Sequence, residues 1–331
     1  MRRELPTGTL ETLRDDVSSF FPPRLRSILL GLSLDVWGRV EEIRLRLGRP
    51  LALNLGEGEV FVDARGRAVD ARAACAVSAD DLQRTVQLVT GASLYAVEDE
   101  LRQGFVTVAG GHRVGFAGRV ILDGRKVRTI KHLAALNFRI SREVRGAADA
   151  VMPLLIDGST VRHTLIISPP RSGKTTLLRD AVRQLSDGIP ALGFPGVTVG
   201  LVDERSEVAG CFRGVPQRDV GMRTDVLDAC PKAEGMMMLL RALSPQVIAT
   251  DEIGRREDVG ALEEVLNAGV SILATAHAAS VDELRRRPVF RDLLALGIIE
   301  RFIVLGRARG PGTVEAVIEG RALRREAAAA C

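Results

Sequence analysis

The sequence predicts an α/β protein: residues 149–331 form a domain with a mostly parallel sheet, and residues 1–148 form a smaller α+β domain before it. The chain has 331 residues, which is enough for two domains. From about residue 160, apolar runs alternate with helix-like segments, a pattern typical of parallel strands joined by crossover helices. Before residue 145, glycine separates short strand-like runs beside helix-like segments, which favours an α+β unit.

In the first domain, helical segments are expected between Leu10 and Leu32. Residues 41–47 alternate apolar and charged side chains at period two, which indicates a half-buried strand. Ser78 precedes two aspartates and is expected to cap a helix that runs through residues 82–90. Asp123-Gly124 predicts a hairpin turn, and Ser141 is expected to start a further helix. The other strands are expected at residues 50–55, 60–62, 104–108, 113–116, 119–122 and 136–140.

The second domain shows the strand–helix alternation most clearly. Its strands are expected at residues 164–167, 197–202, 246–250, 271–275 and 301–305. Its helices are expected at residues 174–185, 233–243, 257–267 and 281–286. Residues 314–318 are expected to close a terminal hairpin.

Composition argues against several classes of protein. No apolar run is long enough to span a membrane, and the N-terminus lacks the apolar stretch of a cleaved signal. The four cysteines have no metal-ligand spacing, which favours reduced thiols in a cytoplasmic protein. The net charge of +4 is spread along the chain and aromatic residues make up 4%, so nucleic-acid binding is not expected. The cysteines are Cys75, Cys211, Cys230 and Cys331.

A phosphate-binding loop is predicted where the first strand of the second domain runs into a helix. The spacing of Gly173, Lys174 and Thr175 fits the P-loop (Walker A) motif, although Ser168 stands where the motif usually has its first glycine. Backbone amides and the helix N-terminus favour phosphate there, and Lys174 would reach the β- and γ-phosphates of ATP. The predicted nucleotide-binding residues are Ser168, Pro169, Pro170, Arg171, Ser172, Gly173, Lys174, Thr175 and Thr176.

A second motif places two carboxylates after the apolar strand 246–250. Asp251 is expected to hold Mg²⁺ together with the Thr175 hydroxyl, and Glu252 to orient and activate the attacking water. An Asp-Glu pair after a strand could equally be a helix cap. The phosphate loop earlier in the chain favours the catalytic interpretation.

Other strand ends are expected to meet at the same edge of the sheet. Asp203 and Glu204 follow one strand, and His277 ends another, where it could sense the γ-phosphate or be structural. The segment from Cys211 to Pro231 is predicted to be a long loop with three arginines, among them Arg223. Such an arginine could complete the site of a neighbouring subunit or lie in solvent.

Several segments resemble the stage III sporulation protein AA family. They include Gly110 to Arg119, Asn137 to Ile140, Asp203 to Glu207, Asp219 to Asp228, Lys232 to Met238 and Asp251 to Gly254. That family in turn resembles the type II and type IV secretion and pilus ATPases. The resemblance implies a RecA-like ATPase domain, a hexameric ring, and catalytic roles for Glu204 in an acidic box and His277 in a histidine box. It also makes Arg113, Arg119 and Arg139 candidates for nucleotide contacts.

The resemblance also implies a setting. It places the protein in the cytoplasm of the mother cell, attached peripherally to the membrane through integral membrane proteins of a sporulation channel complex. The expected function is Mg-dependent ATP hydrolysis that powers this secretion- or channel-like complex during endospore formation. Two alternatives stay open from the sequence: a RecA-like nucleic-acid motor, and a nucleotide-binding scaffold with little turnover.

Overall fold

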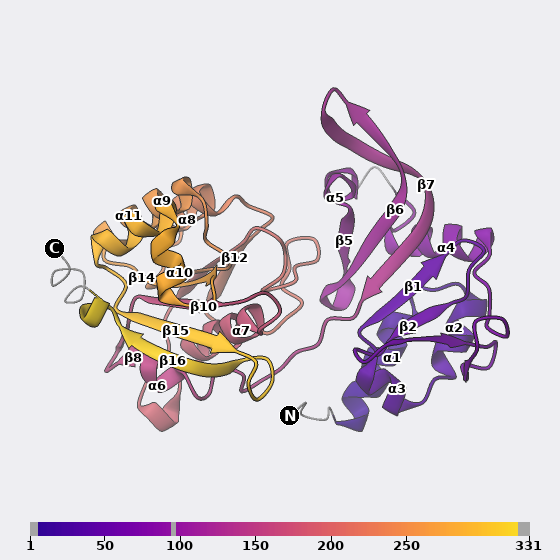
Figure 1. Ribbon diagram of the computed structural model, residues 1–331, viewed down its shortest axis with the longest axis horizontal. Coiled ribbons are helices and arrows are strands. Elements are labelled where there is room, and N and C mark those ends of the chain that lie inside the picture. Colours follow the sequence, from indigo (N-terminus) through magenta and orange to yellow (C-terminus); the bar gives the residue numbers. More distant parts are fainter. Residues whose placement is uncertain (1–5, 94–96, 324–331) are drawn as a thin grey trace. The chain divides into compact units, whose positions relative to one another are not determined.

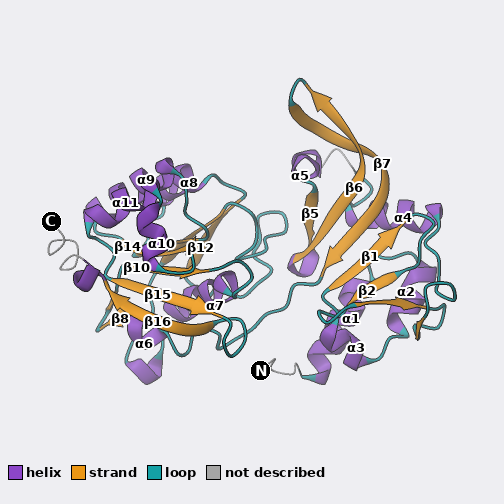
Figure 2. Ribbon diagram, in the orientation of Figure 1, coloured by secondary structure: helices purple, strands orange, loops and turns teal. Residues whose placement is uncertain are grey.

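The computed structural model describes residues 6–93 and 97–323 of the chain. Contacts divide the chain into two compact units, with the division between Arg142 and Glu143 (Figure 1). We call these the N-terminal and C-terminal units. Both combine helices with a sheet, as the secondary-structure colouring of Figure 2 shows. Among the described residues, no helix is both long and apolar enough to cross a membrane.

The N-terminal unit begins with three helices, α1 (Thr7–Ser18), α2 (Pro23–Leu30) and α3 (Leu34–Arg39). Its described residues form a seven-stranded antiparallel sheet in the order β4-β3-β2-β1-β7-β6-β5. The strands are β1 (Glu42–Arg46), β2 (Ala52–Asn54), β3 (Glu59–Val62), β4 (Ala68–Val69), β5 (Phe105–Val108), β6 (His112–Asp123) and β7 (Lys126–Arg139). Helices α4 (Ala79–Val89) and α5 (Glu98–Gln103) complete the unit.

Local chemistry explains these elements. Ser78 caps α4 through a reciprocal capping box with Asp81, as its position predicted. The buried indole of Trp37 donates a hydrogen bond to the Leu29 carbonyl oxygen at 3.1 Å and so joins α3 to α2. The helix predicted after Ser141 is wrong: the Ser141 amide instead donates to His112 Nδ1 at 3.1 Å. Residues 141–144 have no regular structure, and residues 145–151 form turns and bends. The strands predicted separately at 113–116 and 119–122 form one strand, β6.

The C-terminal unit contains a seven-stranded sheet in the order β12-β11-β13-β14-β10-β15-β16 within the described residues. Every neighbouring pair is parallel except β15 with β16, which form the predicted hairpin. The strands are β10 (Thr164–Ser168), β11 (Val199–Asp203), β12 (Thr224–Asp228), β13 (Val247–Thr250), β14 (Ser271–His277), β15 (Arg301–Gly306) and β16 (Thr313–Glu319). The short strands β8 (Ile156–Asp157) and β9 (Thr160–Val161) pair separately.

Helices cover both faces of this sheet. The core on one face contains α6 (Met152–Leu155) and α7 (Lys174–Asp187). The core on the other face contains α8 (Lys232–Ala242), α9 (Arg256–Asn267), α10 (Val281–Arg286) and α11 (Pro288–Leu296). This arrangement confirms the predicted α/β class with a mostly parallel sheet. The prediction of an unbroken loop from Cys211 to Pro231 is wrong, because the segment includes edge strand β12.

Candidate nucleotide-binding site

The phosphate loop, residues 168–176, joins β10 to α7. Ser168 is the last residue of β10, lies opposite His277 of β14, and does not need the positive φ that would favour glycine. Gly173 does need it: its φ is +87°, and a Cβ there would lie 3.0 Å from the Gly312 amide nitrogen. The glycine therefore allows the chain to turn sharply into α7 while the β15–β16 turn packs against it.

The loop has polar groups suited to a bound phosphate. The Ser172 side chain is buried, and its hydroxyl has no hydrogen-bond partner among the described residues. A buried polar atom without a partner is uncommon and calls for an explanation such as an absent ion or ligand. Ser172 lies directly before the N-terminus of α7, whose free amides and dipole favour an anion. These residues fit the phosphates of a nucleotide.

Lys174 is buried in the loop and contacts a neighbouring strand end. Its Nζ lies 2.9 Å from His277 Nδ1, 3.3 Å from Ser168 Oγ and 3.4 Å from the Ser168 carbonyl oxygen. Burial lowers the pKa of Lys174, although the negative charges of Asp251 and Glu252 oppose this shift. Because the protonated lysine donates, His277 Nδ1 accepts, and the imidazole proton lies on Nε2.

The acidic pair that follows β13 faces the start of α7. Thr175 Oγ1 donates to Asp251 Oδ2 at 2.6 Å, and Thr275 of β14 donates to the other Asp251 oxygen. The predicted pair of Mg²⁺ ligands is thus in direct contact. Within the described residues, no group of three or more His, Cys, Asp or Glu side chains could hold a metal ion. Two protein oxygens suit Mg²⁺, which usually completes its shell with water and phosphate oxygens.

Glu252 has an unusual backbone, and each oxygen of its carboxylate accepts a hydrogen bond. Its φ is +53°, and its amide donates to Thr275 Oγ1 at 2.9 Å. Oε1 accepts from His277 Nε2 at 2.6 Å, and Oε2 accepts from Arg205 Nη1 at 2.9 Å. A left-handed glutamate is strained, and such strain is frequent at functional sites. Lys174, His277, Glu252 and Arg205 therefore form one continuous chain of hydrogen bonds.

The predicted acidic residues after β11 have different positions. Asp203 is buried and accepts from the amides of Glu207, Val208 and Ala209 at 2.8 to 3.0 Å, which shapes the following turn. Burial raises its pKa despite these amides. Glu204 pairs with Lys232 and lies 3.6 Å from Arg255 Nη1. A small hollow beside Asp251 is lined by Asp203, Glu204, Arg205, Glu207, Lys232, Asp251 and Glu252.

The structure does not bring Arg223 to this site within one chain. Its Nη1 donates to the Ser186 carbonyl oxygen at 2.7 Å, at the C-terminal end of α7. Ser186 lies twelve residues after Lys174, which corresponds to about 18 Å along the helix axis. Arg113, Arg119 and Arg139 belong to the N-terminal unit, where Arg113 stacks on Phe105 and Arg139 lies 3.9 Å from Glu42.

Three residues at the site were missed in the sequence. Thr275 holds both members of the acidic pair, and Arg205 holds Glu252. Arg307, in the β15–β16 turn, donates to the carbonyl oxygens of Pro170 and Arg171 at 3.0 and 2.7 Å. Strand ends could have suggested Thr275 and Arg205. Nothing local marks Arg307, because its role depends on how the terminal hairpin packs.

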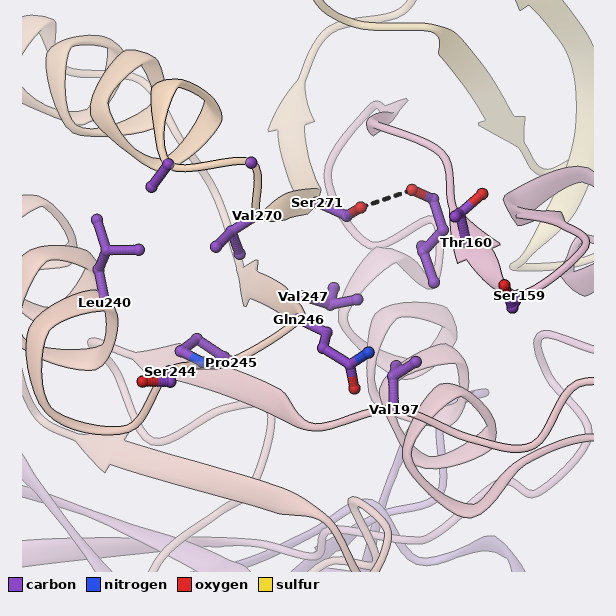
Figure 3. Close-up of a pocket in the computed structure, with 13 residues that line it drawn as sticks. Ser159, Thr160, Val197, Leu240, Ser244, Pro245, Gln246, Val247, Val270 and Ser271 are labelled. Atoms are coloured by element: carbon purple, nitrogen blue, oxygen red, sulfur yellow. Dashed lines mark hydrogen bonds between the residues drawn. The ribbon is translucent and has the colours of Figure 1, made fainter.

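A larger hollow in the C-terminal unit lies elsewhere. It has a volume of about 580 Å³ and lies where β13 and β14 begin, at the opposite end of these strands from Asp251 and His277 (Figure 3). Residues such as Leu240, Gln246, Val270 and Ser271 line it, and none of its lining side chains is ionisable. It offers no cation to a triphosphate, so the candidate site is the edge that carries the phosphate loop.

Solved structures share this fold. The chain is similar to the Legionella pneumophila ATPase DotB, with a TM-score of 0.52 and 15% identity over 80% of this chain and 72% of that one. It is also similar to the pilus retraction motor PilT, solved with bound ADP, with a TM-score of 0.51 and 15% identity over 80% and 74% of the two chains. The chain thus shares its fold with the ATPase DotB and the motor PilT.

The family follows from the sequence comparisons. Residues 11–325 match the family described as sporulation stage III, protein AA. The chain is 42% identical to stage III sporulation protein AA of Bacillus subtilis over 305 residues, which cover 92% of this chain and 95% of that protein. The chain belongs to the sporulation stage III protein AA family, as the motifs predicted. It is also 28% identical over 194 residues to the uncharacterized protein ycf45 of Porphyra purpurea, covering 57% of this chain and 32% of that protein.

Proposed function

We propose that this protein is a Mg-dependent ATPase that powers a membrane-associated, secretion- or channel-like complex during endospore formation. The observation that carries the proposal is the contact between the start of α7 and the carboxyl ends of β13 and β14 at one edge of the sheet. Lys174 contacts His277, His277 contacts Glu252, and Thr175 contacts Asp251. Membership of the sporulation family and the fold of secretion ATPases support the biological part of the proposal.

Each residue has a proposed role. The amides at the start of α7, the Ser172 hydroxyl and Lys174 would bind the phosphates of ATP. Thr175 and Asp251 would hold Mg²⁺, which supplies charge neutralisation at the β- and γ-phosphates. Glu252 would orient the attacking water and accept its proton. Glu204, in the hollow beside Asp251, would assist through its charge, and Lys232 would hold it in place.

The engaged carboxylate of Glu252 suggests how the site would become active. Both of its oxygens accept hydrogen bonds, from His277 and from Arg205. Each oxygen keeps a second acceptor position, which a water molecule could occupy. If Lys174 turns from His277 to a phosphate oxygen, the imidazole loses its donor on Nδ1 and keeps only its contact with Glu252. Binding of the γ-phosphate would thereby change the contact between His277 and Glu252.

The assembly belongs to the same proposal. We propose a homo-oligomeric ring, hexameric by resemblance, on the cytoplasmic side of a membrane complex whose integral proteins are its partners. An arginine from a neighbouring subunit would complete each site. Activity that rises more steeply than linearly with protein concentration would support a shared site. Strict proportionality through the dissociation range would count against it.

Phosphate release from ATP tests the enzymatic proposal. The full chain should hydrolyse ATP with Mg²⁺ and lose activity in EDTA. Lys174→Ala should abolish binding or turnover, and Glu252→Gln should bind ATP but hydrolyse it at least about a hundredfold more slowly, the low end for general base catalysis. Arg72→Ala, which removes an exposed arginine of the N-terminal unit, is the control and should match the parent.

Two outcomes would overturn the proposal. Normal hydrolysis by the Lys174→Ala variant would exclude the phosphate loop as the active site. Strong stimulation by single-stranded DNA or RNA would favour a nucleic-acid motor instead of a secretion-type ATPase.

A further inference from the structure

A projecting part of the N-terminal unit has no role in the proposed chemistry. Strands β6 and β7 extend past the other strands of their sheet as a two-stranded ribbon (Figure 1). Strand β5 pairs with β6 only over residues 112–115, and β1 pairs with β7 only over residues 135–139. We call residues 118–132 the hairpin arm. Along the arm, β6 and β7 pair only with each other among the described strands.

The arm starts at a built irregularity. The register of β6 and β7 shifts between Ala117 and Arg119, and His132 takes a left-handed φ of +47°. A Cβ on Gly118 would lie 2.7 Å from the carbonyl oxygens of Lys131 and His132, so only glycine fits there. Bulges of this kind bend a ribbon away from its sheet. The projection of the arm is therefore specified by the sequence.

One face of the arm is aliphatic. In an antiparallel pair, directly opposite residues share a face, and residues two apart along a strand do too. Val120 pairs with Ile130 and Leu122 pairs with Val127, so these four side chains lie on the same face. Val120, Leu122 and Val127 are 48%, 59% and 38% exposed. Ile130 is partly buried against the core of the unit, and Arg102 of α5 donates to the Arg128 carbonyl oxygen at 3.2 Å. The exposed aliphatic side chains nearer the turn favour aggregation unless something covers them.

The rest of the arm is strongly basic. It has five cations against the single carboxylate of Asp123, a net charge of +4, which equals the formal net charge of the whole chain. All five cations are exposed, and none forms an ion pair within the described part of the chain. The cations are Arg119, Arg125, Lys126, Arg128 and Lys131.

We propose that the hairpin arm binds an anionic lipid surface. Aliphatic side chains would enter the boundary between headgroups and acyl chains, and Arg125 in the turn would contact lipid phosphates. The cations of the opposite face, Arg119, Lys126 and Lys131, would add electrostatic attraction to the anionic surface. A second copy of the arm fits poorly, because the contact would bring two charges of +4 together. A nucleic acid would engage the cations but leave the aliphatic face exposed, and the arm has no Phe, Tyr or Trp for base stacking.

Vesicle co-sedimentation of the full chain without nucleotide tests the proposal. The protein should bind vesicles of 30% phosphatidylglycerol in phosphatidylcholine and should not bind pure phosphatidylcholine vesicles. A basic residue near an anionic surface contributes about fivefold to binding, so Arg125→Gln with Lys126→Gln should lower the partition coefficient about 25-fold. Removal of exposed aliphatic surface by Leu122→Ser should lower it about tenfold.

The matched control is Arg26→Gln with Arg72→Gln, which removes two exposed cations of the same unit outside the arm. It should bind within twofold of the parent, and circular dichroism confirms that every variant is folded. An equal loss of vesicle binding in the control variant would overturn the proposal, because binding would then depend on the net charge of the protein and not on the arm. Binding that Leu122→Ser leaves unchanged, or tighter binding to duplex DNA than to vesicles of equal phosphate content, would also overturn it.

Discussion

Removal of the Thr275 hydroxyl tests how the acidic pair is held. Thr275 is completely buried on β14, where its Oγ1 donates to Asp251 and accepts from the Glu252 amide at 2.9 Å. Thr275→Val keeps the shape of the side chain but leaves that amide without its partner. The unpaired buried amide costs about 1–3 kcal/mol of stability, and the lost hydrogen bond to the Asp251 carboxylate costs about 1.5–3 kcal/mol. Because these two costs overlap, we expect the free energy of unfolding to fall by about 3 kcal/mol.

Thr250→Val is the matched control. Thr250 is equally buried on the neighbouring strand β13, but its hydroxyl makes a single neutral hydrogen bond, to the Val202 carbonyl oxygen at 3.2 Å. Thr250→Val should lower the free energy of unfolding by about 1 kcal/mol. For a domain of this size, 1 kcal/mol corresponds to about 2–4 °C in Tm, so the expected shifts are about 6–12 °C and 2–4 °C.

Thermal unfolding followed by circular dichroism measures both shifts. The chain has one tryptophan, Trp37, which is buried in the N-terminal unit. Its fluorescence should therefore show an unchanged transition in both variants. Thr275→Val should also lower ATP turnover with little change in nucleotide affinity, because Glu252 is displaced while Lys174 is untouched. Equal Tm shifts and equal turnover in the two variants would refute a special role for Thr275.

Three further predictions concern single side chains. Arg307→Ala removes two hydrogen bonds to the phosphate loop and should weaken nucleotide binding about fivefold, corresponding to about 1 kcal/mol, in a fluorescence anisotropy titration. Unchanged affinity would contradict its positioning role. Arg223→Ala should lower stability by about 1 kcal/mol, because the arginine caps α7, and should leave turnover per folded molecule unchanged. Lost turnover in the folded variant would instead support the catalytic role predicted from the sequence. Burial raises the pKa of Cys211 to about 12, so peptide mapping at pH 8 should find it unlabelled by a thiol reagent in the native protein. The Cys211 thiol ionises at lower pH in the unfolded chain than in the folded protein. Its contribution to the free energy of unfolding should therefore fall as pH rises from about 9 towards 12. Rapid labelling of Cys211 in the native protein would contradict its burial.

The parallel sheet could be predicted well because its signal is local. Buried parallel strands are continuous apolar runs, and the strands that carry Ser168, Asp251 and His277 were each found within two residues of an observed boundary. Because the carboxyl ends of parallel strands lie at one edge, the meeting of these residues also followed. Edge strand β12 was missed because only two of its five residues, Val226 and Leu227, are apolar, and because it lies inside a segment rich in turn formers.

The features that the sequence did not predict depend on tertiary packing. Nothing in the residues around Arg223 indicates that its guanidinium ends at the C-terminus of α7 rather than beside the phosphates. Ser141 has the chemistry of a helix cap, but the His112 ring takes its amide, and that contact joins residues 29 positions apart. The paired roles of Thr275 likewise require β13 and β14 to be neighbours, which the order of strands along the chain does not state.

The resting partner of Lys174 affects how readily an anion can enter the site. Its ammonium group lies against an imidazole nitrogen that carries no charge in the neutral ring, 2.9 Å away. Separating a buried ion pair costs about 3–5 kcal/mol, and an incoming phosphate would have to overcome that cost if Lys174 were bound directly to a carboxylate. Here the anion displaces only a neutral acceptor. Nucleotide association should therefore be limited by diffusion and loop geometry rather than by the breaking of an internal salt bridge.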